Sequence, residues 1–310
     1  MRPLLTTVGS LPPFTGSADE ALRKAVTLQK SHGFEILTDG EQRADMLSYY
    51  AGIPGIREEH GIPRVVGRIR PLQDPSQFSK VQDLERVRTL YPEARFKVSL
   101  TGPATFLLAC TARGAGPAYR GPMDPALHDD LLAALVPIAH EIARLGASLQ
   151  LDEPILSQGM RDYRPALARL ETLASEVPRE RAILHACGGH ARSKSLDALL
   201  TLERVGTLSL AFAGRAEMEN RPLLEPRPWE DHGMGLAVGA IDVQVTRPTD
   251  LMTPDAVAAL LDDIVRRVGV ENVTAVTPDC GLRATAPELV PMLLENLRRG
   301  FERTFPIVRA

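Results

Sequence analysis

Residues 148–154 read Ser-Leu-Gln-Leu-Asp-Glu-Pro, a short apolar run that ends in two carboxylates and a proline. Stretches with helical spacing of apolar residues flank this run, one over residues 127–145 and one over residues 163–175. A strand-like run between two helical segments is the repeating unit of a parallel sheet covered by helices. This stretch therefore predicts an α/β fold, and the number of such units decides which α/β fold it is.

The same unit recurs in both directions along the chain. The expected strands are residues 4–8, 35–38, 96–100, 148–151, 182–185, 205–213, 235–245 and 272–277. The expected helices are residues 18–31, 127–145, 163–175, 195–202, 254–268 and 287–301. Eight strands in 310 residues favour a closed (β/α)8 TIM barrel over an open doubly wound sheet. The glycine-rich motifs that mark nucleotide-binding sheets are absent, which supports the same choice.

One connection is much longer than an ordinary loop between a barrel strand and its helix, because residues 39–95 separate the second and third strands. We expect this insertion to fold on itself, with a hairpin near Pro63 to Pro71, and to cover the barrel mouth. The sequence contains no repeat or flexible linker that would divide it. A single domain over residues 1–310 is therefore expected.

Composition excludes several classes of function. The chain has 36 Lys+Arg against 39 Asp+Glu, and a net charge of -3 argues against nucleic acid as a partner. No apolar stretch is long enough to span a membrane, and the N-terminus does not resemble a secretion signal. The three cysteines, Cys110, Cys187 and Cys280, are too few for a disulfide framework. They indicate a reducing compartment, and we expect a cytoplasmic protein.

Polar residues gather where the expected strands end, which in a TIM barrel is the face that carries catalytic groups. His185 and Cys187 are two residues apart, so an extended backbone places both side chains on one face. Cys280 follows the eighth strand, and barrel closure can bring it across the mouth. One imidazole and two thiolates suit zinc and leave a fourth position for substrate. The alternative is that these residues are ordinary core, as we expect for Cys110.

Carboxylates occupy two of the same strand ends. Glu41 follows the second strand, and Asp152 and Glu153 follow the fourth. Adjacent residues in a strand point to opposite faces, so one of the latter pair can enter the mouth while the other braces the barrel or the next helix. Each carboxylate alone could instead cap a helix or pair with an arginine. Beside a soft metal, they suggest a thiol substrate whose ammonium group meets an Asp or a Glu.

At these residues the sequence resembles the catalytic barrel of cobalamin-independent methionine synthases. The matching segments are Thr6-Thr-Val-Gly-Ser10, Asp39-Gly-Glu-Gln-Arg43, Leu100-Thr-Gly-Pro103, Gln150-Leu-Asp-Glu-Pro154, His185-Ala-Cys187 and Pro278-Asp-Cys-Gly-Leu-Arg283. The resemblance is to the short members of the family that have one barrel.

The resemblance implies a zinc-dependent methyltransferase that makes methionine from homocysteine. His185, Cys187 and Cys280 would then bind the zinc, which activates the substrate thiol as a thiolate. The backbone around Gly9 and Ser10 would hold the amino-acid end of homocysteine. Glu41 and Asp152 would be the catalytic and substrate-binding carboxylates. A free thiol is mostly protonated at neutral pH, so such activation is what the reaction needs.

The sequence departs from the family pattern at the expected fourth zinc ligand. The family has a glutamate after the sixth strand, whereas Ala211 or Phe212 occupies that position here. Glu217 and Glu219 lie just downstream. Losing the carboxylate removes one negative charge from the site, so a bound sulfur should be a weaker nucleophile.

Two further departures concern the methyl donor. The family's folate-stacking aromatic residue is missing after Pro103, where Phe106 is out of register. Gln244 replaces a family histidine, and an amide cannot protonate a folate nitrogen as it leaves. A methyl-corrinoid needs no such acid, because reduced cobalt is itself a good leaving group. The sequence therefore favours methylcobalamin, or a corrinoid protein as partner, over methyltetrahydrofolate.

Other functions stay open from the sequence alone. One is a zinc-dependent alkyltransferase with a different thiol acceptor, such as coenzyme M, although Glu41 and Asp152 favour an acceptor with an ammonium group. Another is a non-catalytic relative that binds zinc or a thiol. A metal-free barrel enzyme is a third, but it would have no use for three soft ligands at strand ends.

Overall fold

The protein is described by a computed structural model that covers residues 2–190, 195–214 and 217–307. Eight strands form one parallel sheet in the order β1-β10-β9-β8-β7-β6-β5-β2. Their bounds are β1 (Leu4–Leu5), β2 (Ile36–Leu37), β5 (Arg95–Thr101), β6 (Ser148–Asp152), β7 (Ala182–His185), β8 (Thr207–Ala211), β9 (Gly235–Gly239) and β10 (Val273–Thr277). Thr6 forms a parallel bridge with Ile36, and its Oγ1 donates to the Ile36 carbonyl at 2.8 Å. The first and last strands of the sheet therefore meet, and the predicted α/β TIM barrel is confirmed.

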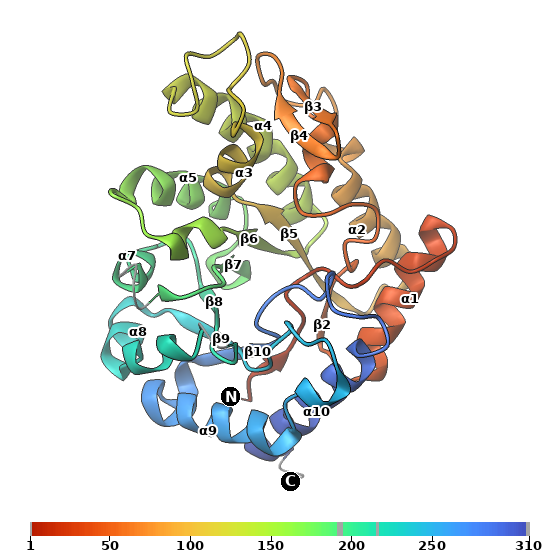
Figure 1. The fold of residues 1–310 in the computed structure, drawn as a ribbon, viewed down its shortest axis with the longest axis vertical. Helices are drawn as coiled ribbons and strands as arrows, with labels where there is room; N and C mark the ends of the chain where they lie inside the picture. Colours follow the sequence, from red (N-terminus) through yellow and green to blue (C-terminus); the bar gives the residue numbers. More distant parts are fainter. Residues whose placement is uncertain (1, 191–194, 215–216, 308–310) are drawn as a thin grey trace.

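Helices surround the strands (Figure 1). Their bounds are α1 (Ala18–Ser31), α2 (Ser79–Leu90), α3 (Pro103–Cys110), α4 (Pro125–Arg144), α5 (Arg164–Ala174), α7 (Leu196–Leu200), α8 (Pro226–His232), α9 (Pro254–Val268) and α10 (Val290–Thr304). All six expected helices are present, with shifted ends in most. No helix in the described part of the chain has the length and apolarity that a membrane span needs.

The sequence pattern missed α2, α3 and α8, each for an identifiable reason. The buried face of α2 includes Lys80 and Asp83, so charged residues interrupt its apolar stripe. The α3 sequence is apolar on nearly every side, which removes the contrast between faces that periodicity requires. The α8 helix is short and has two prolines in its first turn.

Several expected strands are shorter than their apolar runs, most clearly those over residues 4–8, 205–213 and 235–245. The runs over residues 205–213 and 235–245 contribute only β8 and β9 to the sheet. The apolar residues beyond β9, including Ala240 and Ile241, are fully buried without being in a strand. The loops at the barrel mouth are therefore packed, and an apolar run continues past the end of its strand.

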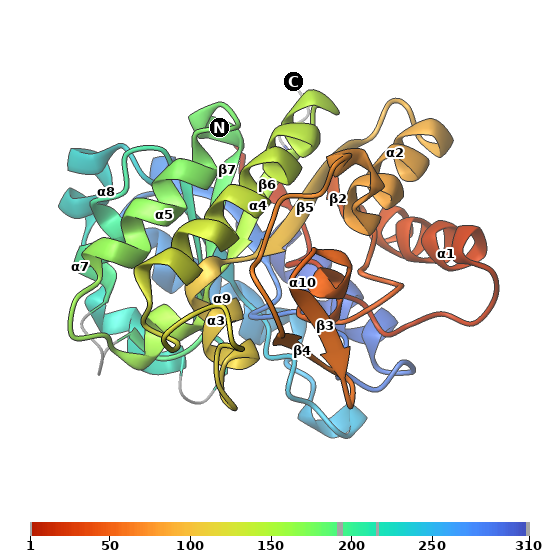
Figure 2. The same cartoon turned by 90° about the horizontal axis from the view of Figure 1, so that it is seen from above.

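The insertion after β2 folds on itself, as expected, but its hairpin lies earlier than predicted. Strands β3 (Ile56–Glu59) and β4 (Ile62–Val65) pair antiparallel, whereas the prediction placed the hairpin near Pro63 to Pro71. The turn is His60-Gly61, and both residues have positive φ. A two-residue turn of this kind favours Asn-Gly, and the His-Gly pair gave a weaker signal. The hairpin packs beside α3 (Figure 2).

Candidate metal and active site

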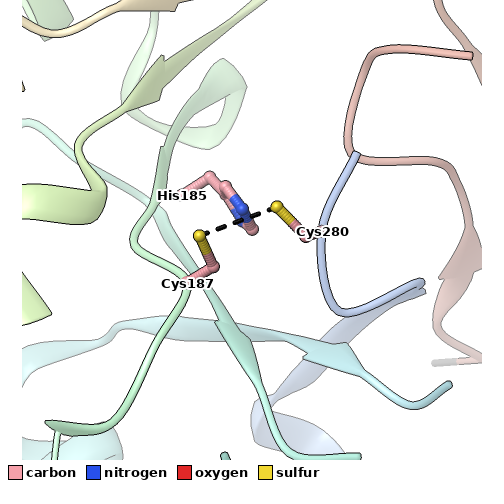
Figure 3. Close-up of side chains that lie close together, drawn as sticks. All are labelled: His185, Cys187 and Cys280. Carbon is pink, nitrogen blue, oxygen red and sulfur yellow. Dashed lines mark hydrogen bonds between the residues drawn. The ribbon is translucent and has the colours of Figure 1, made fainter. Parts of the chain in front are cut away.

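The three predicted soft ligands lie together at the carboxyl ends of two strands. His185 is the last residue of β7, Cys187 follows it, and Cys280 lies in the turn after β10 (Figure 3). One potential ligand atom from each residue lies within 4.8 Å of the others. The two sulfurs are 3.7 Å apart. The structure therefore brings these residues within reach of one ion.

The environment of the cluster fits a cation. His185 is buried; its Nδ1 lies 3.0 Å from Ser209 Oγ, and its Nε2 is buried with no hydrogen-bond partner. Ser209 is paired with His185 in the sheet register, so β8 holds the ring orientation. The contact of its sulfur with Cys187, together with the nearby His185 imidazole, lowers the pKa of Cys280 to about 4 against the opposing effect of burial. The thiolate is the form that binds metals, and an imidazole with two sulfurs is a donor set that zinc accepts.

All the predicted site residues line one cavity of about 290 Å³. The cluster forms one part of its wall, and Gly9, Ser10, Glu41 and Asp152 form another. Asp45 and Met46 also line it, so part of the insertion reaches the barrel mouth, as expected. Arg283 lines it too, although the sequence suggested no role for that residue.

Glu41 is held in a conformation that non-glycine residues seldom adopt. Its φ is 51°, and its N–H donates to Asp39 Oδ1 at 3.0 Å. Lys80 Nζ and Ser99 Oγ both donate to Glu41 Oε1, at 2.5 and 2.7 Å. Sequence reasoning missed Lys80, because nothing in the pattern of α2 distinguished a buried lysine from an exposed one.

Asp152 is supported from inside the barrel. Gln150 Nε2 donates to Asp152 Oδ1 at 2.7 Å, and Lys97 Nζ donates to Gln150 Oε1 at 2.6 Å. Burial raises the pKa of Asp152 to about 6, against the attraction of His185. Burial also lowers the pKa of Lys97 to about 7. A cation entering the cavity would therefore favour the ionised form of Asp152.

Glu153 points away from the cavity and stabilises the start of α3. Its carboxylate accepts hydrogen bonds from the N–H groups of Ala104 and Thr105, each at 2.8 Å, and from Thr105 Oγ1 at 2.6 Å. A carboxylate is favourable at the N-terminus of a helix. Of the two neighbouring carboxylates, Asp152 therefore lines the cavity and Glu153 braces the next helix, which is one of the arrangements that the sequence left open.

The position of the expected fourth ligand holds no carboxylate. Ala211 and Phe212 are buried, and Asp279 accepts the N–H groups of residues 212–214 in the loop after β8. Among the described residues, the soft-ligand cluster contains no acidic member. Glu219 is exposed, and the side chain of Glu217 lies outside the described part of the chain.

The two positions that bear on the methyl donor lie away from the cavity wall. Phe106 is fully buried and packs on Tyr50, with ring centroids 4.6 Å apart. Gln244 is exposed, and its N–H donates to Asp242. Among the described residues that line the cavity, none is a phenylalanine, tyrosine or tryptophan.

A TIM barrel with a His/Cys/Cys cluster and two carboxylates at one cavity defines the class as a barrel enzyme with a candidate metal centre. The chain belongs to the family described as the catalytic domain of cobalamin-independent synthase, whose model matches residues 10–300. It is 30% identical over 299 residues to a methionine synthase of Methanothermobacter thermautotrophicus, covering 92% of this chain and 90% of that protein. A methionine synthase of Methanothermobacter marburgensis is 28% identical, with the same coverage. The chain is therefore a methyltransferase.

Solved structures show the same fold. The B12-independent methionine synthase from Shewanella sp. W3-18-1, in complex with selenomethionine, has a TM-score of 0.79 at 20% identity and covers 98% of both chains. A methyltransferase from Methanosarcina mazei has a TM-score of 0.66 at 16% identity, over 96% of this chain and 92% of its own. At these identities the likeness concerns the fold alone.

Proposed function

We propose that this chain is a zinc-dependent thiol S-methyltransferase that converts homocysteine to methionine. The observation that carries the proposal is the shared cavity, because one wall offers three soft ligands and another offers two carboxylates. Homocysteine has a thiol at one end and an ammonium group at the other, and the two walls suit these two groups. The relatives described as methionine synthases support the same substrate.

Each residue then has a defined task. His185, Cys187 and Cys280 would hold the ion, and Ser209 keeps the imidazole in place. Zinc bound there would supply the positive charge that lowers the pKa of a substrate thiol. Glu41 and Asp152 would bind the ammonium group, and the backbone at Gly9 and Ser10 would lie along the amino-acid end. Fixing the sulfur in line with the methyl carbon is the main catalytic contribution of the protein.

We propose a methyl-corrinoid, free or on a partner protein, as the methyl donor. Sulfur forms a bond to the methyl carbon as the carbon–cobalt bond breaks, the bonding electrons stay on cobalt, and the thiol proton is released. A folate donor would need a ring to stack on and an acid for its nitrogen. Phe106 is buried in the core, and Gln244 lies away from the cavity wall.

The metal assignment is tested by zinc content. The wild type should bind about one zinc per chain, and Cys280→Ala should lose stoichiometric binding. Cys110→Ala is the matched control, because Cys110 is buried outside the cluster and should leave zinc content unchanged. Equal zinc content in all three proteins would contradict the assignment.

The substrates are tested by turnover. Methionine should form from homocysteine and methylcobalamin, and not from homocysteine and methyltetrahydrofolate. Turnover with folate alone would refute the corrinoid donor and leave the acceptor intact. Turnover of coenzyme M in place of homocysteine would refute the acceptor.

A further inference from the structure

The segment between β2 and β5 places a buried lysine against Glu41, a residue of the cavity wall. Lys80 lies in α2 and is 1% exposed. Its Nζ lies 2.5 Å from Glu41 Oε1 and 4.4 Å from the centroid of the Tyr49 ring. Burying an ammonium group is costly unless it is paired, and here the pairing is with a carboxylate and an aromatic face. Lys80 is therefore ordered by Glu41 and cannot leave it without losing its main partner.

Glu41 is fixed from several sides. Arg283 Nη1 donates to its carbonyl oxygen at 2.9 Å, and Asp39 accepts its N–H. Lys80 and Ser99 hold its carboxylate. Holding a non-glycine residue at positive φ is unfavourable, so these contacts must maintain it. The carboxylate is therefore presented in one orientation.

The two donors use the same carboxylate oxygen. Lys80 and Ser99 both bind Oε1, and no hydrogen bond to Oε2 is formed within the described chain. Oε2 is also not among the unpartnered atoms that are fully buried, and Glu41 lines the cavity. One oxygen is thus occupied by the protein, and the other is available to a ligand.

We propose that Lys80 is a positioning residue that occupies Oε1 of Glu41 and reserves Oε2 for the ammonium group of an amino-acid substrate. This inference rests on the proposed amino-acid thiol substrate. It adds the residue that orients Glu41 toward the ammonium group of that substrate. Lys80 balances the charge of Glu41, while Asp152 supplies a further negative charge for the incoming ammonium group. The selection of an amino acid over its des-amino analogue then depends on a residue of α2, the helix between β2 and β5.

The test compares two ligands that differ only in the ammonium group, L-methionine and 4-(methylthio)butanoate. Their dissociation constants are measured by calorimetry on zinc-loaded wild type, Lys80→Met and Lys24→Met. The ratio of the two constants cancels any contribution of the sulfur. Hydrogen bonds to charged groups are worth about 1.5–3 kcal/mol, so Lys80→Met should reduce the preference for L-methionine about 10-fold or more. Lys24 is exposed, and its variant should keep the wild-type preference.

The outcomes separate the two proposals. If wild type binds both ligands equally, the proposed amino-acid substrate fails, and this inference fails with it. If wild type prefers L-methionine and Lys80→Met keeps the full preference, only the role of Lys80 is overturned. Should Lys80→Met fail to fold, Ser99→Ala decides, because it removes only the neutral donor to the same oxygen. A smaller loss of preference, about 3-fold, is expected there, and an unchanged preference would overturn the inference.

Discussion

At the scale of single residues, Ser209 is the contact on which the orientation of His185 depends. Its hydroxyl lies 3.0 Å from Nδ1, which turns Nε2 toward the two sulfurs. Removing a partner that orients a metal-binding histidine costs about 10- to 100-fold in metal affinity. We therefore predict that Ser209→Ala weakens zinc binding by that factor, measured by competition with a chelator.

Ser99→Ala is the matched control for this prediction. Both serines are buried on barrel strands, but Ser99 donates to Glu41 and not to His185. Its zinc affinity should equal that of the wild type. Equal weakening in both variants would indicate general loosening of the barrel and would count against a specific role of Ser209.

The sequence anticipated some of these residues and missed others for a physical reason. His185 and Cys187 were paired because an extended backbone repeats every two residues, and Cys280 was placed by barrel closure. Lys80 was not anticipated, because its burial depends on how α2 packs against β5 and the neighbouring helices, and not on any local pattern. Interactions set by local geometry could be predicted, whereas interactions set by the packing of the insertion could not.

At the scale of elements, the junction between β5 and α3 depends on the absence of a side chain. A Cβ on Gly102 would lie 2.1 Å from Glu153 Cγ, and Glu153 is the carboxylate that accepts the first N–H groups of α3. The φ of Gly102 is -68°, so the requirement is steric and not conformational. We predict that Gly102→Ala lowers the free energy of unfolding by about 2–4 kcal/mol, from overpacking and lost hydrogen bonds.

Urea denaturation measures this effect, with Gly121→Ala as control. A Cβ at Gly121 meets nothing within 4 Å, so that variant should unfold like the wild type. A Gly102→Ala protein of unchanged stability would mean that Glu153 can move without releasing α3. The motif Thr101-Gly102-Pro103 would then need another explanation.

The elements that could be predicted were those with one apolar face and one polar face. The α9 helix begins and ends at the expected residues, with a threonine cap at Thr253 and an apolar stripe on one side. The hairpin predicted near Pro63 to Pro71 was misplaced, because the strands that pair are β3 and β4, on either side of His60-Gly61. Alternation indicates an extended backbone, but pairing requires a partner that the sequence does not identify.

At the scale of the whole molecule, the barrel could be predicted because eight similar units allow few other arrangements. The closure itself is a contact between Thr6 and Ile36, at the two ends of the sheet. The interior was not anticipated, because a sequence pattern does not distinguish a lysine inside a barrel from one on its surface. Lys97 is such a residue, and its burial has a consequence for the stability of the whole protein.

Lys97 is 3% exposed, and burial lowers its pKa from 10.5 to about 7. Between about pH 7 and 10.5, the unfolded chain holds a proton on this lysine that the folded chain has lost. Stability rises with pH wherever the unfolded state binds more protons, here by up to about 1.4 kcal/mol per pH unit. We predict that Lys97→Met removes this pH dependence. The stability of the variant relative to the wild type should therefore be greatest near pH 7 and should fall toward pH 10.

The measurement is the free energy of unfolding in urea at several pH values between 7 and 10, for wild type, Lys97→Met and Lys24→Met. Losing the hydrogen bond to Gln150 lowers the free energy of unfolding of Lys97→Met by the same amount at every pH. This loss shifts the plot of that free energy against pH without changing its slope. Titratable groups that all three proteins share contribute equally to the pH dependence of each, so they cancel when the three slopes are compared. Lys24 is exposed, so its variant should keep the wild-type slope. Parallel lines for wild type and Lys97→Met would mean that Lys97 stays protonated inside the barrel, and that Asp152 and Gln150 compensate a buried charge throughout this range.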